Sequence, residues 1–162
     1  MRRITLLLLI ISVLGSAAWA ATVQDQNKAV ARRVFDEIFN QGKYEVANEI
    51  YAPDFVNHGF STNIGLKEDQ AAARGWREAI PDIKVTIKMM MADGDLVTVL
   101  WHAEGTNTGQ GNGLPATGKK VKGRGITIWR IVNGKICEEW SEFDQLRLMQ
   151  QLGLIPAEKK PN

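Results

Sequence analysis

The sequence predicts an α+β domain in which helices pack on one face of a curved antiparallel sheet. Helix-type patterns fill residues 22–79, strand-type patterns fill residues 83–143, and two hairpin turns join the strands. Helices packed in this way leave a cavity between the two layers. That cavity is the expected place for a functional site.

The first twenty residues have the features of a secretory signal peptide. Arg2 and Arg3 precede an apolar run, and Ala18-Trp19-Ala20 has the small-x-small form of a signal-peptidase site. The run is too short to span a bilayer with ease, although an uncleaved N-terminal anchor is the alternative. We expect cleavage after Ala20, a periplasmic or secreted protein, and no membrane attachment once the signal is removed.

The rest of the chain has the length of one domain, which we place at residues 21–155, before a flexible tail at 156–162. The full chain has 20 Lys and Arg against 18 Asp and Glu, and loss of the two N-terminal arginines leaves 18 of each. Nucleic-acid binding needs a concentrated basic stripe, so we expect no nucleic-acid partner. Cys137 is the only cysteine, which excludes an internal disulfide and suits a core or interface residue.

Three helices and one short extended segment are expected in the first half. Thr22 is placed to cap a helix whose apolar residues recur at helical spacing from 29 to 39. A shorter helix over 44–51 is followed by an extended piece at 54–58. The third helix covers 66–79 and is stopped by a proline.

The second half is mostly sheet. Four strands are expected, at residues 83–91, 96–104, 122–132 and 135–143. The last two meet at Asn133-Gly134, the strongest short-range hairpin signal. The Gly-rich stretch 105–120 predicts a long loop, which at this length is usually functional or mobile. An amphipathic helix over 145–154 closes the domain.

Asp144 stands where the last strand turns into the last helix, beside Trp140 and within reach of Trp129. In an apolar pocket a carboxylate has its neutral form favoured, which raises its pKa towards neutrality. It could then carry a proton to or from carbon next to a carbonyl. Asp is also a preferred helix N-cap, which would keep the group ionised. The spacing alone leaves both roles open.

Strand pairing identifies a possible pocket wall. A two-residue turn pairs Val132 with Lys135 and sets Trp129 opposite Glu138. Alternation then groups the residues of one face: Thr127, Trp129, Glu138, Trp140, Glu142 and Asp144. Arg130 falls on the opposite face unless a bulge intervenes. Tryptophans at such spacings also suit a plain core, but an aromatic wall suits a flat apolar ligand.

Trp76 on the third helix and Trp101 on the second strand are further candidates for ligand contact. His58 is a candidate second acid–base group, or else a loop histidine bonded to backbone. It lies far from His102 without a cluster of Cys or acids, so no metal site is expected. Residues 109–113 resemble a phosphate loop, but no helix follows, so no nucleotide cofactor is expected.

A set of short motifs in a fixed order resembles the SnoaL-like polyketide cyclase family, within the nuclear transport factor 2-like superfamily. The motifs lie at 51–58, 80–82, 94–95, 105–106, 115–119, 134–136, 138, 140, 144 and 151–153. The resemblance covers roughly residues 28–153. It implies a cone-shaped α+β barrel, a pocket closed by the N-terminal helices, and homodimers through the outer sheet face.

The resemblance also implies cofactor-free acid–base chemistry, in which the acid after the last strand carries the proton. Asp144 matches that acid, and His58 matches a histidine often found near the pocket. The family often has Gly-Thr-His where this chain has Asn107, so any role of that histidine is lost here.

The leading hypothesis is an exported SnoaL-like enzyme of cyclase or isomerase type. It would act on a small apolar carbonyl compound, with Asp144 as general acid/base and no cofactor. The alternative is a non-catalytic binding module for a hydrophobic small molecule. A homodimeric interaction protein without a ligand is the third hypothesis.

Overall fold

A computed structural model describes residues 21–59 and 61–156. The expected signal peptide, and all of the expected tail except Pro156, lie outside these residues. Within them, no helix is long and apolar enough to cross a membrane.

The helices agree closely with the sequence patterns. They are α1 (Val23–Arg33), η1 (Val34–Phe39), η2 (Tyr44–Val46), α2 (Ala47–Ile50), α3 (Leu66–Ala79) and α4 (Gln145–Leu152). Thr22 caps α1, since its hydroxyl accepts a hydrogen bond from the backbone N–H of Asp25 at 3.1 Å. The expected helix over 29–39 ends as the π-helical segment η1, which directly continues α1.

One six-stranded sheet collects all the strands. They are β1 (Tyr51–His58), β2 (Asn63–Gly65), β3 (Lys84–Asp93), β4 (Leu96–Thr106), β5 (Lys120–Val132) and β6 (Lys135–Phe143), in the order β2-β1-β6-β5-β4-β3. Every neighbouring pair is antiparallel except β1 and β6. The expected extended piece at 54–58 is longer than the sequence suggested. Pro53 is tolerated inside β1 because the β1–β6 ladder is irregular between Tyr51 and Val56.

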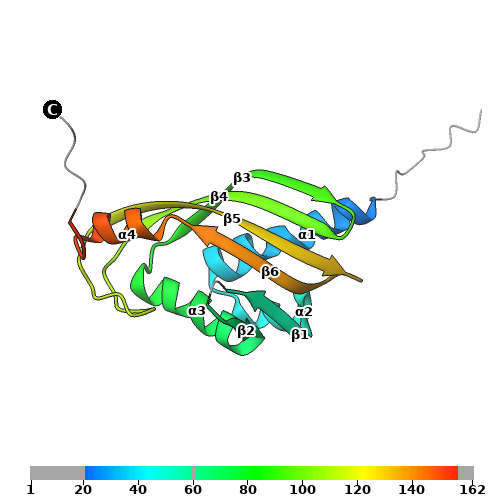
Figure 1. Ribbon diagram of the computed structural model, residues 1–162, viewed down its shortest axis with the longest axis horizontal. Helices are drawn as coiled ribbons and strands as arrows, with labels where there is room; N and C mark the ends of the chain where they lie inside the picture. The colour runs from blue at the N-terminus through cyan, green and yellow to red at the C-terminus, as the bar shows by residue number, and fades with distance from the viewer. Residues whose placement is uncertain (1–20, 60, 157–162) are drawn as a thin grey trace, which may run out of the picture.

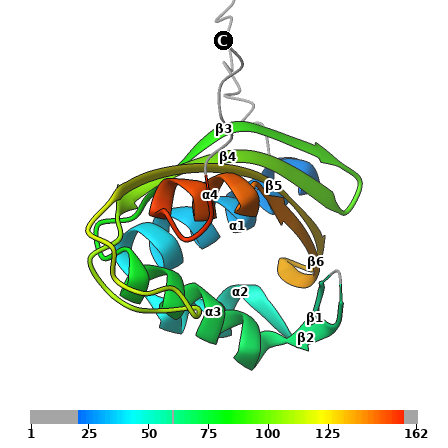
Figure 2. The same ribbon diagram turned by 60° about the vertical axis from the view of Figure 1, so that its left-hand side comes forward.

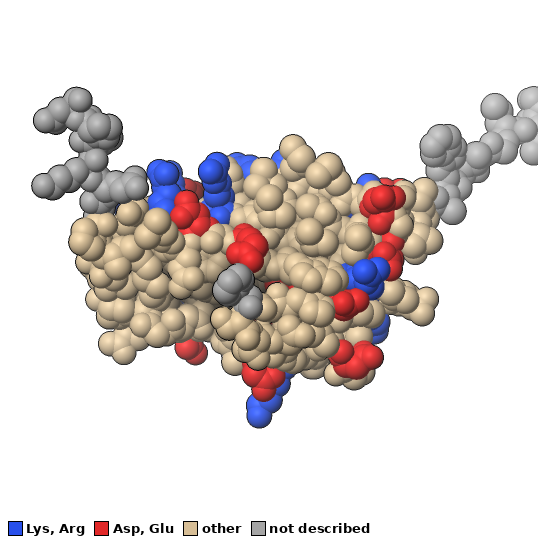
Figure 3. Space-filling model, in the orientation of Figure 1, with Lys and Arg blue, Asp and Glu red and all other residues tan. Residues whose placement is uncertain are grey.

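The sheet curves around the helices (Figures 1 and 2). Strands β3 to β6 arch over α1 and η1, while α3, β1 and β2 lie on the opposite side of the molecule from β3 and β4. This is the α+β arrangement that the sequence predicted. The core between the layers includes the fully buried Ile38, Val99 and Trp129. The surface in Figure 3 carries acidic and basic side chains interspersed.

A β-bulge in the last hairpin reverses the expected faces of β6. Val132 pairs with Lys135, as expected for the two-residue turn, but Trp129 pairs with Glu139. The register shifts because Cys137 is an extra residue on β6 with no partner on β5. A shift of one residue moves every later side chain to the other face of the sheet. The expectation that Glu138 and the residues in step with it face inward is therefore wrong.

The long loop between β4 and β5, residues 107–119, packs against α3. Asn107 is fully buried and ties the loop together: its amide donates to the Ala79 carbonyl at 2.9 Å, and its Oδ1 accepts from the backbone N–H of Thr117 at 2.9 Å. Gly109 and Gly111 lie so close to carbonyls of α3 that a Cβ at either position would collide with them. The loop is thus anchored to the helix that forms one side of the hollow.

Candidate active site

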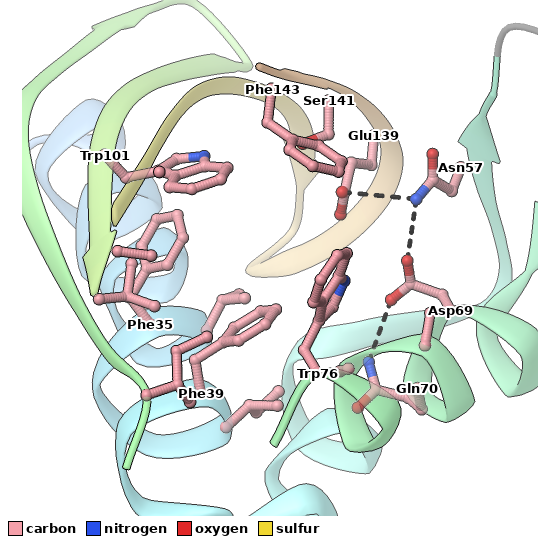
Figure 4. A pocket seen from close by; sticks show the side chains of 18 of the residues that line it. Phe35, Phe39, Asn57, Asp69, Gln70, Trp76, Trp101, Glu139, Ser141 and Phe143 are labelled. Atoms are coloured by element: carbon pink, nitrogen blue, oxygen red, sulfur yellow. Dashed lines mark hydrogen bonds between the residues drawn. The ribbon is translucent and has the colours of Figure 1, made fainter. Parts of the chain in front are cut away.

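The hollow between the sheet and the helices contains a pocket of about 300 Å³. This volume is at the lower end of the range for small-molecule sites. Helices η1 and α3 line one side and strands β4 to β6 the other, as the close-up in Figure 4 shows. Most of the lining is apolar, and four of its polar side chains, those of Asn57, Asp69, Gln70 and Glu139, lie together.

Two carboxylic acids, Asp69 and Glu139, belong to this polar group. Asp69 lies in the first turn of α3, and Glu139 lies on β6. The side-chain amide of Asn57 lies between them, donating to Asp69 Oδ1 at 2.9 Å and approaching Glu139 Oε1 at 3.4 Å (Figure 4). Gln70 donates to the other Asp69 oxygen at 3.2 Å, and the indole N–H of Trp129 donates to Glu139 Oε2 at 2.7 Å.

The environment keeps a proton on this acid pair near neutral pH. Burial raises the pKa of Glu139 to about 8, helped by the nearby charge of Asp69 and opposed by the Trp129 hydrogen bond. Burial also raises the pKa of Asp69, but hydrogen bonds from Asn57 and Gln70 oppose the rise. Asp69 accepts two hydrogen bonds from side-chain amides, whereas Glu139 accepts one longer one. We therefore assign the charge to Asp69 and the proton to Glu139. Burial raises the pKa of the adjacent Tyr51 well above its ordinary value, so its phenol stays neutral.

Aromatic rings line much of the rest of the pocket: Phe35, Phe39 and Trp101 lie across from the acid pair, while Trp76 and Phe143 lie nearer to it (Figure 4). Phe35 packs against Trp129 with ring centroids 5.4 Å apart and against Trp101 at 6.4 Å. Trp76 from α3 meets the end of β6 edge-on, with 5.6 Å between its ring and that of Phe143. Such walls accept a flat apolar ligand and can hold it with one edge towards the acid pair.

Of the eight residues that the sequence singled out, Trp76, Trp101 and Trp129 line the pocket. Thr127 is buried just behind the wall. Its hydroxyl accepts from the indole N–H of Trp101 at 3.0 Å and bonds to the Ser141 hydroxyl at 2.8 Å. Thr127 therefore orients the Trp101 ring without lining the pocket itself.

His58, Glu138 and Trp140 lie on the outer face of the sheet and do not line the pocket. His58 Nε2 is 2.8 Å from Glu138 Oε2, and its ring stacks on Trp140 with centroids 4.6 Å apart and planes 10° from parallel. Glu138 also accepts from Arg130 at 2.8 Å. For Glu138 and Trp140 the outward position is caused by the bulge at Cys137, which directs Glu139 rather than Glu138 inward.

Asp144 is the N-cap of α4 rather than a pocket acid. Its side chain is exposed, and Oδ1 accepts from the backbone N–H of Arg147 at 3.0 Å. The alternative that the spacing left open, the helix cap, is thus the geometry found. Asp144 is not among the residues that line the pocket.

Replacing Asp144 by Ala is expected to lower the free energy of unfolding by about 1 kcal/mol, because one helix N–H loses its acceptor. Urea titrations would measure this, and Asp144→Ser, which keeps a capping oxygen, should recover most of the loss. Ligand binding to the pocket should not change in either variant. A folded Asp144→Ala protein that no longer binds pocket ligands would contradict the assignment of Asp144 as a cap.

Sequence reasoning missed Asn57, Asp69 and Glu139. Asp69 resembles the acids that commonly occupy the first turn of a helix, where they are usually exposed. Glu139 could have been found only by testing both registers of the last hairpin. Asn57 gave one usable signal, since strand alternation sends it to the face opposite His58.

Among residues 21–59 and 61–156, no group of three or more His, Cys, Asp or Glu side chains lies together in a way that could hold a metal ion. The acid pair is bonded to amides and an indole instead.

The profile of the SnoaL-like polyketide cyclase family matches residues 29–152. Curated proteins give no match. Among solved structures, AclR from Streptomyces galilaeus, a candidate hydroxylase, is similar with a TM-score of 0.77 at 23% identity, over 85% of this chain and 87% of that one.

Two further structures are similar over nearly their whole length. A candidate SnoaL-like polyketide cyclase from Jannaschia sp. CCS1 has a TM-score of 0.76 at 23% identity, over 85% of this chain and 98% of that one. IdmH from Streptomyces antibioticus, a candidate polyketide cyclase, has a TM-score of 0.70 at 26% identity, over 79% of this chain and 99% of that one. The fold is therefore that of SnoaL-like, nuclear transport factor 2-like proteins.

Proposed function

Because the chain belongs to the SnoaL-like polyketide cyclase family, which supports a cyclase or isomerase role on a small molecule, we propose an acid–base enzyme that moves protons on a small apolar carbonyl compound. Asp69 acts as the base and Glu139 as the acid. The observation that carries the proposal is the buried acid pair, bridged by Asn57 in an aromatic pocket.

The two acids suit opposite roles. Asp69, charged and held by two amides, removes a proton from the carbon next to the carbonyl. Glu139, held neutral by burial, gives its proton to the carbonyl oxygen as the enol forms. The enol can then collapse in two ways, and in both its O–H proton returns to Glu139. If the enol is conjugated with a C=C bond, Asp69 gives its proton to the far carbon, which is isomerisation. If the enol carbon attacks a second carbonyl carbon and closes a ring, Asp69 gives its proton to the oxygen of that second carbonyl.

The lining defines the class of ligand. Among the residues that the structure describes, no Lys, Arg or His side chain lines the pocket. A carboxylate or phosphate on the ligand would therefore enter beside the charge of Asp69 without a cation to offset it. An uncharged, flat ketone satisfies both the aromatic walls and the neutral Glu139 donor.

We also propose that the protein acts after export and as a homodimer. The small-x-small site at residues 18–20 supports export. The outer sheet face exposes large apolar side chains, including Met89, Met91 and Ile126, at 52%, 56% and 47%, and this supports pairing through that face.

Solvent hydrogen exchange of 2-tetralone, a flat bicyclic ketone, tests the function. The protein in deuterated buffer is expected to speed the loss of the proton signals next to the carbonyl, followed by NMR. Asp69→Asn is expected to slow this exchange by about 10²-fold or more, because a general base is lost. Asp36→Asn, which changes an exposed acid, is the control.

Exchange no faster than in buffer, while 2-tetralone still quenches tryptophan fluorescence, would contradict catalysis and leave a binding module. Equal rates in the wild type and Asp69→Asn would contradict the role of Asp69.

A further inference from the structure

His58, Glu138 and Trp140 form a cluster on the outer face of the sheet, behind the acid pair. His58 and Asn57 are consecutive residues of β1, and their side chains leave opposite faces of the sheet. Each bonds to one of two consecutive residues of β6: Asn57 to Glu139 on the pocket side, and His58 to Glu138 on the outer side. The two contacts therefore join β1 to β6 on both faces of the sheet.

Backbone pairing holds this end of β1 on both sides, but over a few residues only. The β1–β6 ladder is irregular after Tyr51 and resumes only at Val56 and Asn57, which pair with Glu138 and Glu139. On its other side β1 pairs with the three-residue strand β2. Because these ladders are short, side-chain contacts add to what fixes Asn57 in place.

The contacts of His58 are well suited to that task. Glu138 is ionised, because hydrogen bonds from His58 and Arg130 hold its pKa below the ordinary value, so the His58 Nε2–H donates to a charged acceptor. Arg130 on β5 bonds in turn to Asp95, before β4, at 2.7 Å. Trp140 supports the flat side of the imidazole. The partner of His58 is thus tied to strands across the sheet.

We propose that His58 is a positioning residue, which acts through Glu138 and Trp140 to hold the end of β1 and with it the Asn57 amide against the two pocket acids. The effect on catalysis rests on the proposed function, but the positioning of Asn57 by His58 does not.

The direction of the effect follows from the hydrogen bonds. The Asn57 amide stabilises the charged form of Asp69 and so lowers its pKa. If β1 loosens, Asp69 loses that donor and holds a proton to higher pH. The midpoint pH at which the acid pair titrates should therefore rise when either Asn57 or the contact that positions it is removed.

A pH titration of the infrared carbonyl band of neutral Glu139 in the free protein tests this without any substrate, because that band reports the proton on the acid pair itself. His58→Gln is expected to raise the midpoint by on the order of half a pH unit or more. Glu138→Gln, which removes the charge of the acceptor in the same contact, should shift the midpoint in the same direction. His102→Gln, which alters the exposed histidine of β4, is the control and should titrate as the wild type.

Asn57→Leu and the double variant Asn57→Leu/His58→Gln decide whether His58 acts through Asn57. Non-additivity is expected: the double variant should titrate as Asn57→Leu does. Additive shifts, or a His58→Gln midpoint equal to that of the wild type, would overturn the proposal. If Asn57→Leu titrates with the same midpoint as the wild type, the proposed coupling of Asn57 to the two pocket acids is wrong as well. This outcome would count against the proposed function, whereas the outcomes above count only against the positioning role of His58.

Discussion

Replacing Glu139 by Gln is expected to slow the exchange of 2-tetralone by about 10²-fold or more, because the amide cannot deliver a proton to the carbonyl oxygen. Binding of the ketone should survive, since Gln keeps the shape of the side chain and the aromatic walls are unchanged. The wild-type rate should itself fall as pH rises through about 8, where Glu139 loses its proton.

Glu138→Gln is the matched control, because it makes the same chemical change one residue away on the outer face of the sheet. Because Glu138 helps His58 to position Asn57, we expect this variant to shift the pH dependence of the exchange rate. Its maximal rate should stay much closer to that of the wild type. If Glu139→Gln exchanged the ketone as fast as the wild type, the pocket acid would have no catalytic role.

The stability of the wild-type protein is expected to fall as pH rises from about 4.5 to about 8. In this range folded Glu139 keeps a proton that the unfolded chain, with the ordinary pKa of 4.5, has released. Stability from this group is complete below pH 4.5 and is lost as pH rises through the folded pKa, by on the order of a few kcal/mol. The raised pKa of Asp69 acts in the same direction.

Glu139→Gln should flatten this dependence, so that the variant is similar in stability to the wild type at pH 4, more stable than it at pH 6, and more stable still at pH 9. Urea unfolding at three pH values measures the difference. Glu142→Gln, which alters an exposed acid of the same strand, serves as the control. Parallel curves for the wild type and Glu139→Gln would show that Glu139 titrates normally in the folded protein.

Local signals predicted the fold well. The 66–79 helix has a proline beyond its end, and the Asn133-Gly134 turn needs two residues with positive φ, which it has at 50° and 74°. Each of these signals acts within a few residues, so a single sequence contains all the information that they require.

The acid pair depends on contacts that local patterns do not encode. The face of β6 is decided by one extra residue, Cys137, whose lack of a partner is a property of two paired strands rather than of either strand alone. Asp69 becomes a pocket acid only because β1 and β6 pack against the start of α3. The aromatic wall was predicted in part: Trp76, Trp101 and Trp129 line the pocket, whereas the same bulge turns Trp140 to the outer face.

The protonation state of Glu139 is the central claim, and the infrared spectrum of the folded protein at pH 7 tests it most directly. We predict a carbonyl band from a neutral carboxylic acid that disappears in Glu139→Gln, persists in Glu138→Gln, and is lost from the wild type above pH 9. A wild-type spectrum at pH 7 with no neutral carboxyl band would contradict the claim, because Glu139 would then have no proton to give.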